Sequence, residues 1–343
     1  MRAASVSENF DFNITTLNPP KRPTGGALIK LLGCGLCGSD LEKLMHKKAE
    51  PGSVLGHEVV GTITELCPTY QGDFSVGDRI VTSHHVPCLT CQYCLNDAES
   101  MCRDFKRSNL APGGFSEIIA LTEGHLNHTA FKVPHHITHA EASCVEPLSC
   151  VVKGVRRSGT IKGNGHVLII GLGFIGLLAA QLYHQQGHAV YGVDINDEKI
   201  KFANEQDWFT AACQPNQLND HLPVSTPDNP FVGMDTVFVS IVLPQTLKQT
   251  FNTIRDGGTI VQFSRAFSPE AQYNPDELYY REIQIVPSYS PSLIDLNTAA
   301  QLIFSKEINV APLCTHQFTL ENANQALDAY RSGQAIKALL VPS

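Results

Sequence analysis

Clusters of lysine and arginine are absent from the sequence, and acidic side chains outnumber basic ones. The 343 residues include 25 Lys and Arg against 33 Asp and Glu, which gives a formal net charge of −8. Nucleic-acid binding usually needs a basic stripe or patch, and electrostatic attachment to a membrane needs a run of cations. The composition therefore argues against a nucleic-acid partner and against a membrane partner.

Long hydrophobic runs are missing as well. The longest uncharged apolar stretch, residues 167–180, is too short to span a bilayer and is interrupted by glycine. Residues 1–20 contain Glu8 and Asp11 and no continuous apolar core, so we expect no signal peptide. These absences predict a soluble and cytoplasmic protein.

Charged residues are few, at 17% against 43% hydrophobic residues, which excludes intrinsic disorder. The length favours about two domains. Up to residue 150, short apolar runs at 27–32, 59–63 and 79–82 alternate with turns rich in Gly and Pro. Short strands separated by turns are typical of a β-rich domain.

After residue 150 the pattern changes to alternating strands and helices. We expect strands at 167–170, 189–194, 236–240 and 259–263, and helices at 174–186, 197–206 and 245–255. This alternation predicts a doubly wound α/β domain with a parallel sheet. Segment 214–230 holds four prolines and is expected to be irregular. Helices are expected at 295–305 and 321–332, and the apolar run 338–341 could add a strand to the first domain.

Cysteine is abundant but unevenly placed. Four of the eleven cysteines, Cys88, Cys91, Cys94 and Cys102, crowd into fifteen residues. Four thiolates at such short spacings can close a tetrahedron around zinc, and a site with four protein ligands is structural. Free surface cysteines or a disulfide remain as the alternative, and a zinc ribbon of a nucleic-acid protein could look similar.

A glycine fingerprint, Gly171-Leu-Gly173-Phe-Ile-Gly176, follows one predicted strand and opens a helix. In a dinucleotide-binding turn the first glycine permits the tight turn, the second admits the pyrophosphate, and the third lets helix and strand approach. Asp194 lies 18 residues after Gly176, where a carboxylate can accept hydrogen bonds from ribose hydroxyls and repel a 2′-phosphate. This favours NAD over NADP. Lys199 weakens that preference because it could approach a phosphate, and a set of helix-packing glycines is the alternative.

A third group comprises Cys37, His57, Glu58 and, far downstream, Glu146. Each of these residues is unremarkable alone. A single histidine near a strand is usually structural, and Cys34-Gly-Leu-Cys37 could be a redox pair.

Together these motifs resemble the medium-chain, zinc-containing alcohol and polyol dehydrogenase family over essentially the whole chain. The matching elements are Cys-Gly-Ser-Asp at 37–40, Gly-His-Glu at 56–58, Gly-Asp-Arg-Ile-Val at 77–81, the cysteine lobe at 88–102, Gly-Gly-Phe-Ser-Glu at 113–117, Val-Glu-Pro-Leu at 145–148 and the fingerprint at 171–176. Glu146-Pro147 makes the chain most similar to the branch that holds sorbitol, threonine and sugar-phosphate dehydrogenases. The liver alcohol dehydrogenase branch has a cysteine there.

The resemblance implies a GroES-like β-rich catalytic domain at residues 1–151, with a structural zinc lobe at 88–102. It also implies a Rossmann NAD-binding domain at 152–288 and a return to the catalytic domain at 289–343. The family usually forms homodimers or homotetramers, so we expect a homo-oligomer.

The resemblance also implies roles for the residues of a catalytic zinc site. Cys37 and His57 would be zinc ligands, Glu58 a ligand or the holder of a metal-bound water, and Glu146 a ligand or near-ligand. Ser39 would take the hydroxyl proton of the alcohol. Ile175 and Lys199 match positions that contact the cofactor.

One departure concerns the proton relay. The family often has a histidine five residues after the zinc-binding cysteine, where this chain has Glu42. A carboxylate can pass protons, but its reference pKa of about 4.3 is below the value of about 6.5 for histidine. The relay is therefore weakened, rerouted through water or tuned by burial.

The expected function is a zinc-dependent transfer of hydride between NAD and a secondary alcohol, polyol or sugar (phosphate) substrate. Amino-alcohol oxidation, as in L-threonine dehydrogenases, is one alternative, and a non-catalytic NAD-binding relative is another. A decayed relative would be expected to lose Cys37, His57 or Glu146, and this chain keeps all three. The particular alcohol is not specified by any spacing rule.

Overall fold

The computed structural model describes residues 1–159, 161, 163–223, 225 and 231–343. The chain forms two compact units, one of Met1–Ser149 with Pro291–Ser343 and one of Cys150–Ser290. Helix α5 (Val145–Arg157) contains the point of division.

The first unit is rich in β-structure. Its strands are β1 (Arg2–Val6), β2 (Phe12–Thr16), β3 (Ala27–Gly35), β4 (Glu58–Leu66), β5 (Arg79–Thr82), β6 (Ile118–Leu121), β7 (Ala130–Lys132), β14 (His316–Thr319) and β15 (Ala338–Val341). Its helices are α1 (Gly38–Met45), α2 (Arg103–Arg107), α3 (Glu123–His128), α4 (His139–Ser143), α11 (Leu293–Phe304) and α12 (Ala323–Arg331). Short 3-10 turns are η1 (Cys94–Asn96), η2 (Glu99–Met101), η4 (Ala311–Leu313) and η5 (Leu320–Asn322).

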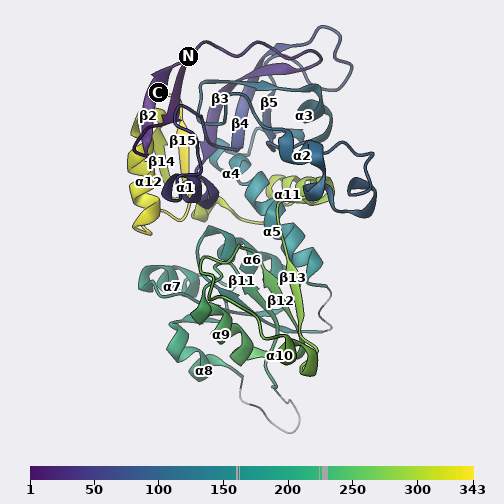
Figure 1. Cartoon of the computed structure of the whole chain (residues 1–343), viewed down its shortest axis with the longest axis vertical. Helices are drawn as coiled ribbons and strands as arrows, with labels where there is room; N and C mark the ends of the chain where they lie inside the picture. The colour runs from purple at the N-terminus through teal and green to yellow at the C-terminus, as the bar shows by residue number, and fades with distance from the viewer. Residues whose placement is uncertain (160, 162, 224, 226–230) are drawn as a thin grey trace. The chain divides into compact units, whose positions relative to one another are not determined.

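Seven strands of this unit form one sheet in the order β14-β15-β3-β4-β5-β7, with β6 also paired to β3. Strand β15 runs antiparallel to β3, with Leu340 opposite Cys34, so a strand from the C-terminal end joins the sheet of the first half of the chain (Figure 1). The apolar side chains of Ile29, Ile63 and Ile80 are completely buried beneath it. The terminal run 338–341 thus supplies the additional strand that its apolar character suggested.

The second unit is a parallel sheet with crossover helices. Its strands are β8 (His166–Ile170), β9 (Ala189–Val193), β10 (Ala211–Cys213), β11 (Met234–Val239), β12 (Ile254–Gln262) and β13 (Gln284–Pro287). Its helices are α6 (Phe174–Gln185), α7 (Asp197–Asn204), α8 (Leu218–His221), α9 (Pro244–Thr253) and α10 (Pro275–Tyr280), with the 3-10 turn η3 (Pro215–Gln217).

The strand order of the second unit is β10-β9-β8-β11-β12-β13, and all pairings are parallel. The chain winds in one direction from β8 to β10 and in the other from β11 to β13. The direction therefore reverses between β8 and β11, and ligands of doubly wound sheets bind at the carboxyl ends of the strands at such a point. The predicted fold class is confirmed.

The prediction for segment 214–230 was wrong in its first part. Pro215 opens η3, and α8 follows directly. Proline is tolerated at the first helical position because its missing N–H would have no partner within the helix. Residues 224 and 226–230 of that segment lie outside the described residues.

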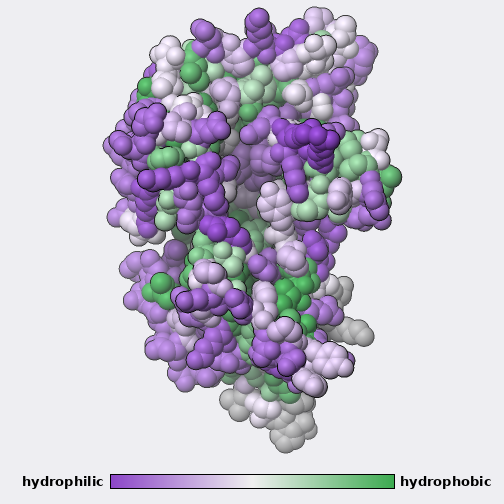
Figure 2. Space-filling model, viewed as in Figure 1, coloured by the Kyte–Doolittle hydropathy of each residue, from purple (hydrophilic) through white to green (hydrophobic). Residues whose placement is uncertain are grey.

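The surface of the protein is mostly polar. On the face shown in Figure 2, hydrophilic side chains predominate and apolar ones form small groups. Within the part of the chain that the structure describes, every helix is too short or too polar to cross a membrane.

Candidate active site

The candidate metal site of the first unit is built on the pairing of β3 with β4. Gly35, the last residue of β3, lies opposite Glu58, the first residue of β4. A Cβ atom on Gly35 would collide with Glu58 Oε2, so only glycine permits this approach. The pairing brings the loop after β3, which carries Cys37, next to the segment of His57 and Glu58.

These three residues form a compact donor cluster. Their ligand atoms, the Cys37 sulfur, a ring nitrogen of His57 and a carboxylate oxygen of Glu58, all lie within 4.8 Å of one another. Cys37 also caps helix α1, where its sulfur accepts a hydrogen bond from the Ser39 N–H at 3.5 Å. The cluster joins the start of a helix to the start of a strand, and both are fixed by backbone hydrogen bonds.

Asp40, which the sequence analysis left without a role, holds this cluster together. Its completely buried carboxylate accepts hydrogen bonds from the backbone N–H of Cys37 at 3.1 Å and of Gly56 at 3.3 Å. Asp40 Oδ1 also lies 3.5 Å from Nδ1 of His57. Because Nδ1 faces Asp40, Nε2 is the ring nitrogen that remains for a metal. The signal was present in the sequence, since Asp40 belongs to the Cys-Gly-Ser-Asp motif.

The ionised forms of Asp40 and His57 stabilise each other. Burial opposes the ionised forms, but Asp40 and Cys37 raise the pKa of His57 well above its usual range. In the same way, His57 lowers the pKa of Asp40 despite the burial of the carboxyl group.

Glu58 has a buried partner that sequence reasoning missed. Lys337, directly before β15, forms an ion pair with Glu58 Oε2, and the two side chains are only 4% and 0% exposed. Lys337 Nζ also donates to the carbonyl of Leu36 at 3.1 Å. Glu58 Oε1 is buried and has no hydrogen-bond partner among the described residues. The pair fixes the carboxylate and leaves one oxygen for a further ligand.

Glu146 lies near the cluster but is not a member of it. Its buried carboxylate approaches Nδ1 of His84 at 3.9 Å, and the His84 ring lies 4.7 Å from the ring of His57 between centroids. Burial, with a contribution from Glu58, raises the pKa of Glu146 to about 7, although His57 acts in the opposite direction. Burial and the neighbouring His57 lower the pKa of His84 well below its usual range. His84 is a further residue that the sequence analysis did not identify.

The residues present fit zinc. Zinc accepts sulfur, imidazole nitrogen and carboxylate oxygen, and catalytic sites combine three such protein ligands with one open position. The buried, unpartnered Oε1 of Glu58 is the feature that a metal would satisfy, and the donor atoms of Cys37 and His57 belong to the same cluster.

The predicted proton-transfer residues lie in helix α1. Ser39 is exposed in its first turn, next to the sulfur of Cys37. Glu42 lies one turn further and forms an ion pair with Lys48 at 3.1 Å, with the Lys48 side chain more than half exposed.

The cysteine lobe brings Cys88, Cys91, Cys94 and Cys102 together, with all four sulfur atoms within 4.8 Å of one another. The sulfur of Cys94 lies 4.0 Å from that of Cys88 and 3.6 Å from that of Cys91. Four thiolates bound to one zinc at about 2.3 Å would be about 3.8 Å apart, so the sulfur spacing matches a tetrahedral site. Hydrogen bonds from Thr90 lower the pKa of Cys88 to about 6, which favours the thiolate that binds metal.

The fingerprint of the second unit lies at the carboxyl end of β8. Gly171 has φ +92°, and a Cβ on Gly176 would collide with the carbonyl oxygen of Gly171. A Cβ on Gly173 would meet nothing within 4 Å, so this residue faces open space at the start of α6. The half-buried Ile175 follows in the first turn of that helix. The turn therefore places the N-terminus of α6 at the carboxyl end of β8, the arrangement that binds phosphate in dinucleotide-binding domains.

Asp194 is held against this turn. Its two carboxylate oxygens accept hydrogen bonds from the N–H of Leu172 and of Asn196, at 2.8 and 2.9 Å. Each oxygen keeps a further acceptor site for a ribose hydroxyl. Asn196 caps helix α7, whose third residue is Lys199.

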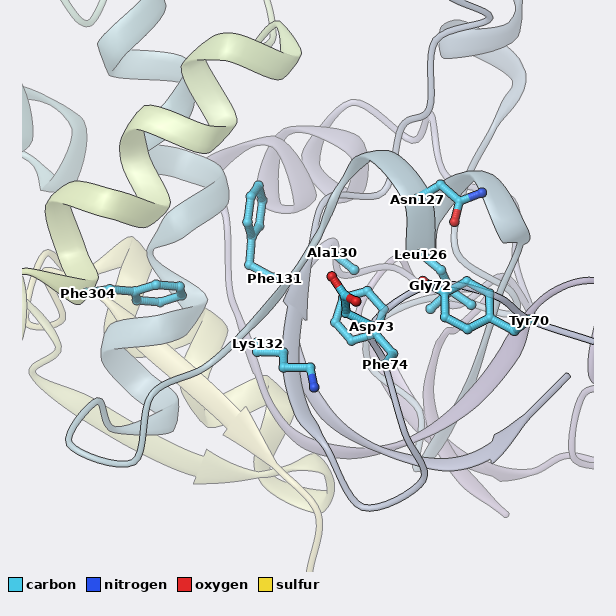
Figure 3. A pocket seen from close by; sticks show the side chains of 10 residues that line it. All are labelled: Tyr70, Gly72, Asp73, Phe74, Leu126, Asn127, Ala130, Phe131, Lys132 and Phe304. Atoms are coloured by element: carbon cyan, nitrogen blue, oxygen red, sulfur yellow. The ribbon is translucent and has the colours of Figure 1, made fainter. Parts of the chain in front are cut away.

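A separate cavity of about 480 Å³ lies in the first unit. It is lined by aromatic and polar side chains that include Tyr70, Asp73, Phe74, Phe131, Lys132 and Phe304 (Figure 3). The ammonium group of Lys132 is paired with Asp78 at 2.9 Å. None of the predicted site residues lines this cavity, so it is separate from the candidate active site.

Comparisons with known proteins place the chain among the zinc-binding dehydrogenases. The family model of the alcohol dehydrogenase GroES-like domain matches residues 23–135, and that of the zinc-binding dehydrogenases matches residues 175–305. The sorbitol dehydrogenase of Halalkalibacterium halodurans is 29% identical, over 92% of this chain and 91% of the relative. D-arabinitol dehydrogenase 1 of Uromyces fabae is 28% identical, over 100% and 97%. The solved structure of a zinc-binding dehydrogenase target from Sinorhizobium meliloti 1021, bound to NADP, superposes with a TM-score of 0.86 at 25% identity and covers 99% of each chain.

The chain belongs to the family of medium-chain, zinc-binding alcohol and polyol dehydrogenases. The predicted activity is confirmed at this level: the protein is a zinc-dependent oxidoreductase that uses a nicotinamide cofactor on alcohols or polyols. The roles of individual residues remain predictions.

Proposed function

We propose that this enzyme oxidises a secondary alcohol, polyol or sugar phosphate with NAD, and that Cys37, His57 and Glu58 hold the catalytic zinc. The observation that carries the proposal is the cluster of sulfur, nitrogen and oxygen donors within 4.8 Å. Zinc at this cluster would supply Lewis acidity, which makes an alcohol hydroxyl easier to deprotonate.

The surrounding residues hold this donor set and receive the proton. Asp40 orients the ring of His57, and Lys337 orients the carboxylate of Glu58. Ser39 accepts the hydroxyl proton and passes it to water, because its side chain is exposed. Glu146 is a further zinc ligand or lies next to the ligands. This route leaves Glu42 outside the relay, in agreement with its ion pair to a solvent-exposed lysine.

The second unit would bind the cofactor that accepts the hydride. Gly171, Gly173, Ile175 and Gly176 form the phosphate-binding turn, and Asp194 accepts the ribose hydroxyls. The fixed negative charge of Asp194 disfavours the 2′-phosphate of NADP. Lys199 lies on the helix that begins beside this carboxylate, so it contacts the adenosine end of the cofactor.

A second zinc at Cys88, Cys91, Cys94 and Cys102 would be structural, because four protein ligands leave no open position. The proposal also includes the domain boundaries given above, with a catalytic domain at 1–151 and 289–343 and an NAD-binding domain at 152–288. We further propose a homodimer or homotetramer located in the cytoplasm, because eleven cysteines without a disulfide suit a reducing compartment.

The test is a panel of polyols, secondary alcohols, sugar phosphates and L-threonine, each offered with NAD to the zinc-loaded protein. Formation of reduced nicotinamide is followed by its absorbance. We expect turnover with at least one polyol or sugar derivative, loss of that turnover in Cys37→Ser, and retention in Cys67→Ser. Turnover with L-threonine alone would favour the amino-alcohol alternative, and turnover that survives Cys37→Ser would refute the assigned zinc site.

A further inference from the structure

Two cysteines outside both metal clusters lie side by side in the first unit. The sulfur atoms of Cys144 and Cys314 are 3.6 Å apart, although the residues are 170 positions apart in the chain. Cys144 is completely buried between α4 and α5, and Cys314 is half-buried after η4. A disulfide needs a sulfur separation of about 2.05 Å, so a small rotation and shift would join this pair.

The pair differs in access and in reactivity. Half-buried Cys314 can be reached by a small oxidant, whereas Cys144 is completely buried. The hydrogen bond with Cys144 lowers the pKa of Cys314 despite partial burial, and the charge of Lys337 acts in the same direction. A thiol with a lowered pKa, beside a second thiol, is the arrangement in which a first oxidised sulfur can be resolved as a disulfide.

Both cysteines are connected to the candidate active site, Cys144 through the sequence and Cys314 through a hydrogen bond of the next residue. Cys144 stands two residues before Glu146, and its sulfur donates to the carbonyl of Ala140 at 3.3 Å. Thr315 follows Cys314, and its hydroxyl donates to the backbone carbonyl of Lys337 at 3.3 Å. A bond between the two sulfur atoms would therefore displace the segment that carries Glu146 and the segment that carries Lys337.

We propose that Cys144 and Cys314 form a reversible oxidation site, at which a peroxide converts the two thiols into a disulfide that slows turnover. The peroxide oxygen is transferred to the sulfur of Cys314, which becomes a sulfenic acid while one water leaves. The Cys144 sulfur then attacks that sulfur, the S–O bond breaks, and a second water leaves with the proton of the thiol. Two electrons pass from the thiols to the peroxide, and an added dithiol reverses the change.

The disulfide itself is tested by peptide mapping of the zinc-loaded full chain. The protein is treated with hydrogen peroxide, its remaining thiols are blocked, and its digest is analysed by mass spectrometry with and without a dithiol. We expect a dithiol-sensitive peptide pair joined through Cys144 and Cys314 in the wild type. Cys67→Ser serves as a matched control, because the hydrogen bond to Thr69 lowers the pKa of Cys67 to about 7 and makes it a reactive thiol outside the pair. The joined peptides should persist in Cys67→Ser and disappear in Cys314→Ser and Cys144→Ala.

The effect on turnover rests on the proposed function and is measured on the same samples. A displacement of about 1 Å at a catalytic group can cost up to about 10²-fold, so we expect oxidation to slow the wild type by about tenfold or more. Activity should return with the dithiol, and Cys314→Ser should retain it under the same peroxide treatment, with zinc content unchanged throughout.

The two experiments test the disulfide and its effect on turnover separately. Absence of the joined peptides, or peptides that join either cysteine to a third one, would overturn the proposal. Joined peptides with unchanged turnover, or equal inactivation and zinc loss in Cys314→Ser, would overturn its regulatory part. If the reduced wild type oxidises no alcohol of the panel, the proposed function fails, and peptide mapping still decides whether the site exists.

Discussion

Replacement of Asp40 by asparagine tests how the candidate metal site is held. The carboxylate serves three donors, which are the N–H groups of Cys37 and Gly56 and the Nδ1 of His57. Asparagine has nearly the same shape but only one acceptor oxygen, so its NH₂ group must face at least one of these donors. A buried donor without an acceptor costs about 1–3 kcal/mol, and a hydrogen bond to a charged group is worth about 1 kcal/mol more than a neutral one.

The expected loss of stability for Asp40→Asn is therefore about 3 kcal/mol. With a urea slope near the upper end of about 1–3 kcal/mol per M, the unfolding midpoint should fall by about 1 M. The affinity for the zinc held by Cys37, His57 and Glu58 should fall by about 10- to 100-fold, as is typical when a partner of a ligating histidine is removed.

The assays are urea unfolding and competition for zinc with a chelator. Asp78→Asn is the matched control, because Asp78 also accepts a backbone hydrogen bond, from Ser75 at 2.8 Å, and pairs with Lys132. It should leave zinc affinity unchanged. If Asp40→Asn keeps the wild-type unfolding midpoint and binds zinc within about twofold of the wild type, the positioning role of Asp40 is refuted.

Four further changes test other parts of the structure. Cys91→Ser should release one zinc and lower the unfolding temperature, since the cysteine lobe depends on its metal; an unchanged melting curve would contradict this. The wild type should show a higher kcat/KM with NAD than with NADP, and Asp194→Asn should reduce this preference for NAD. A higher kcat/KM with NADP in the wild type would show that a cation such as Lys199, and not Asp194, decides the choice of cofactor. Glu42→Gln should leave kcat within about twofold of the wild type and its pH profile unaltered, because the carboxylate forms an ion pair with Lys48. A fall in kcat of about tenfold or more would show that Glu42 takes part in the proton relay. Burial opposes the ionisation of Glu141, but the hydrogen bond from Lys306 lowers its pKa, so the ionised carboxylate stabilises the fold above its unfolded pKa and this stability is lost as pH falls through the lowered pKa. Glu141→Gln should therefore weaken the fall of the unfolding free energy at acid pH, and an unchanged dependence on pH would contradict this.

The sequence predicted the strands that are short apolar runs between turns. Residues 79–82 form β5 and residues 167–170 lie in β8, because each is an apolar run bounded by turns. The glycine fingerprint could be placed at the end of a strand because its spacing has a steric cause, and the collision expected for a Cβ on Gly176 shows that cause directly. Helix α8 was missed because the surrounding prolines suggested a loop.

The parts of the site that escaped prediction depend on contacts between distant segments. Lys337 reaches Glu58 only because β15 pairs with β3, and the apolar run 338–341 indicated a further strand but not which strand it would pair with. The approach of His84 to Glu146 likewise follows from tertiary packing. Asp40 could have been found, since it lies three residues after Cys37 at the start of a helix, where an acidic side chain commonly accepts a backbone hydrogen bond.

The proposed function requires that the chain holds two zinc ions, one of them at Cys37, His57 and Glu58. Elemental analysis of the purified, metal-saturated wild type beside folded Cys37→Ser tests it most directly. We expect two zinc ions per chain in the wild type and one in the variant. One zinc in the wild type, or two in Cys37→Ser, would contradict it.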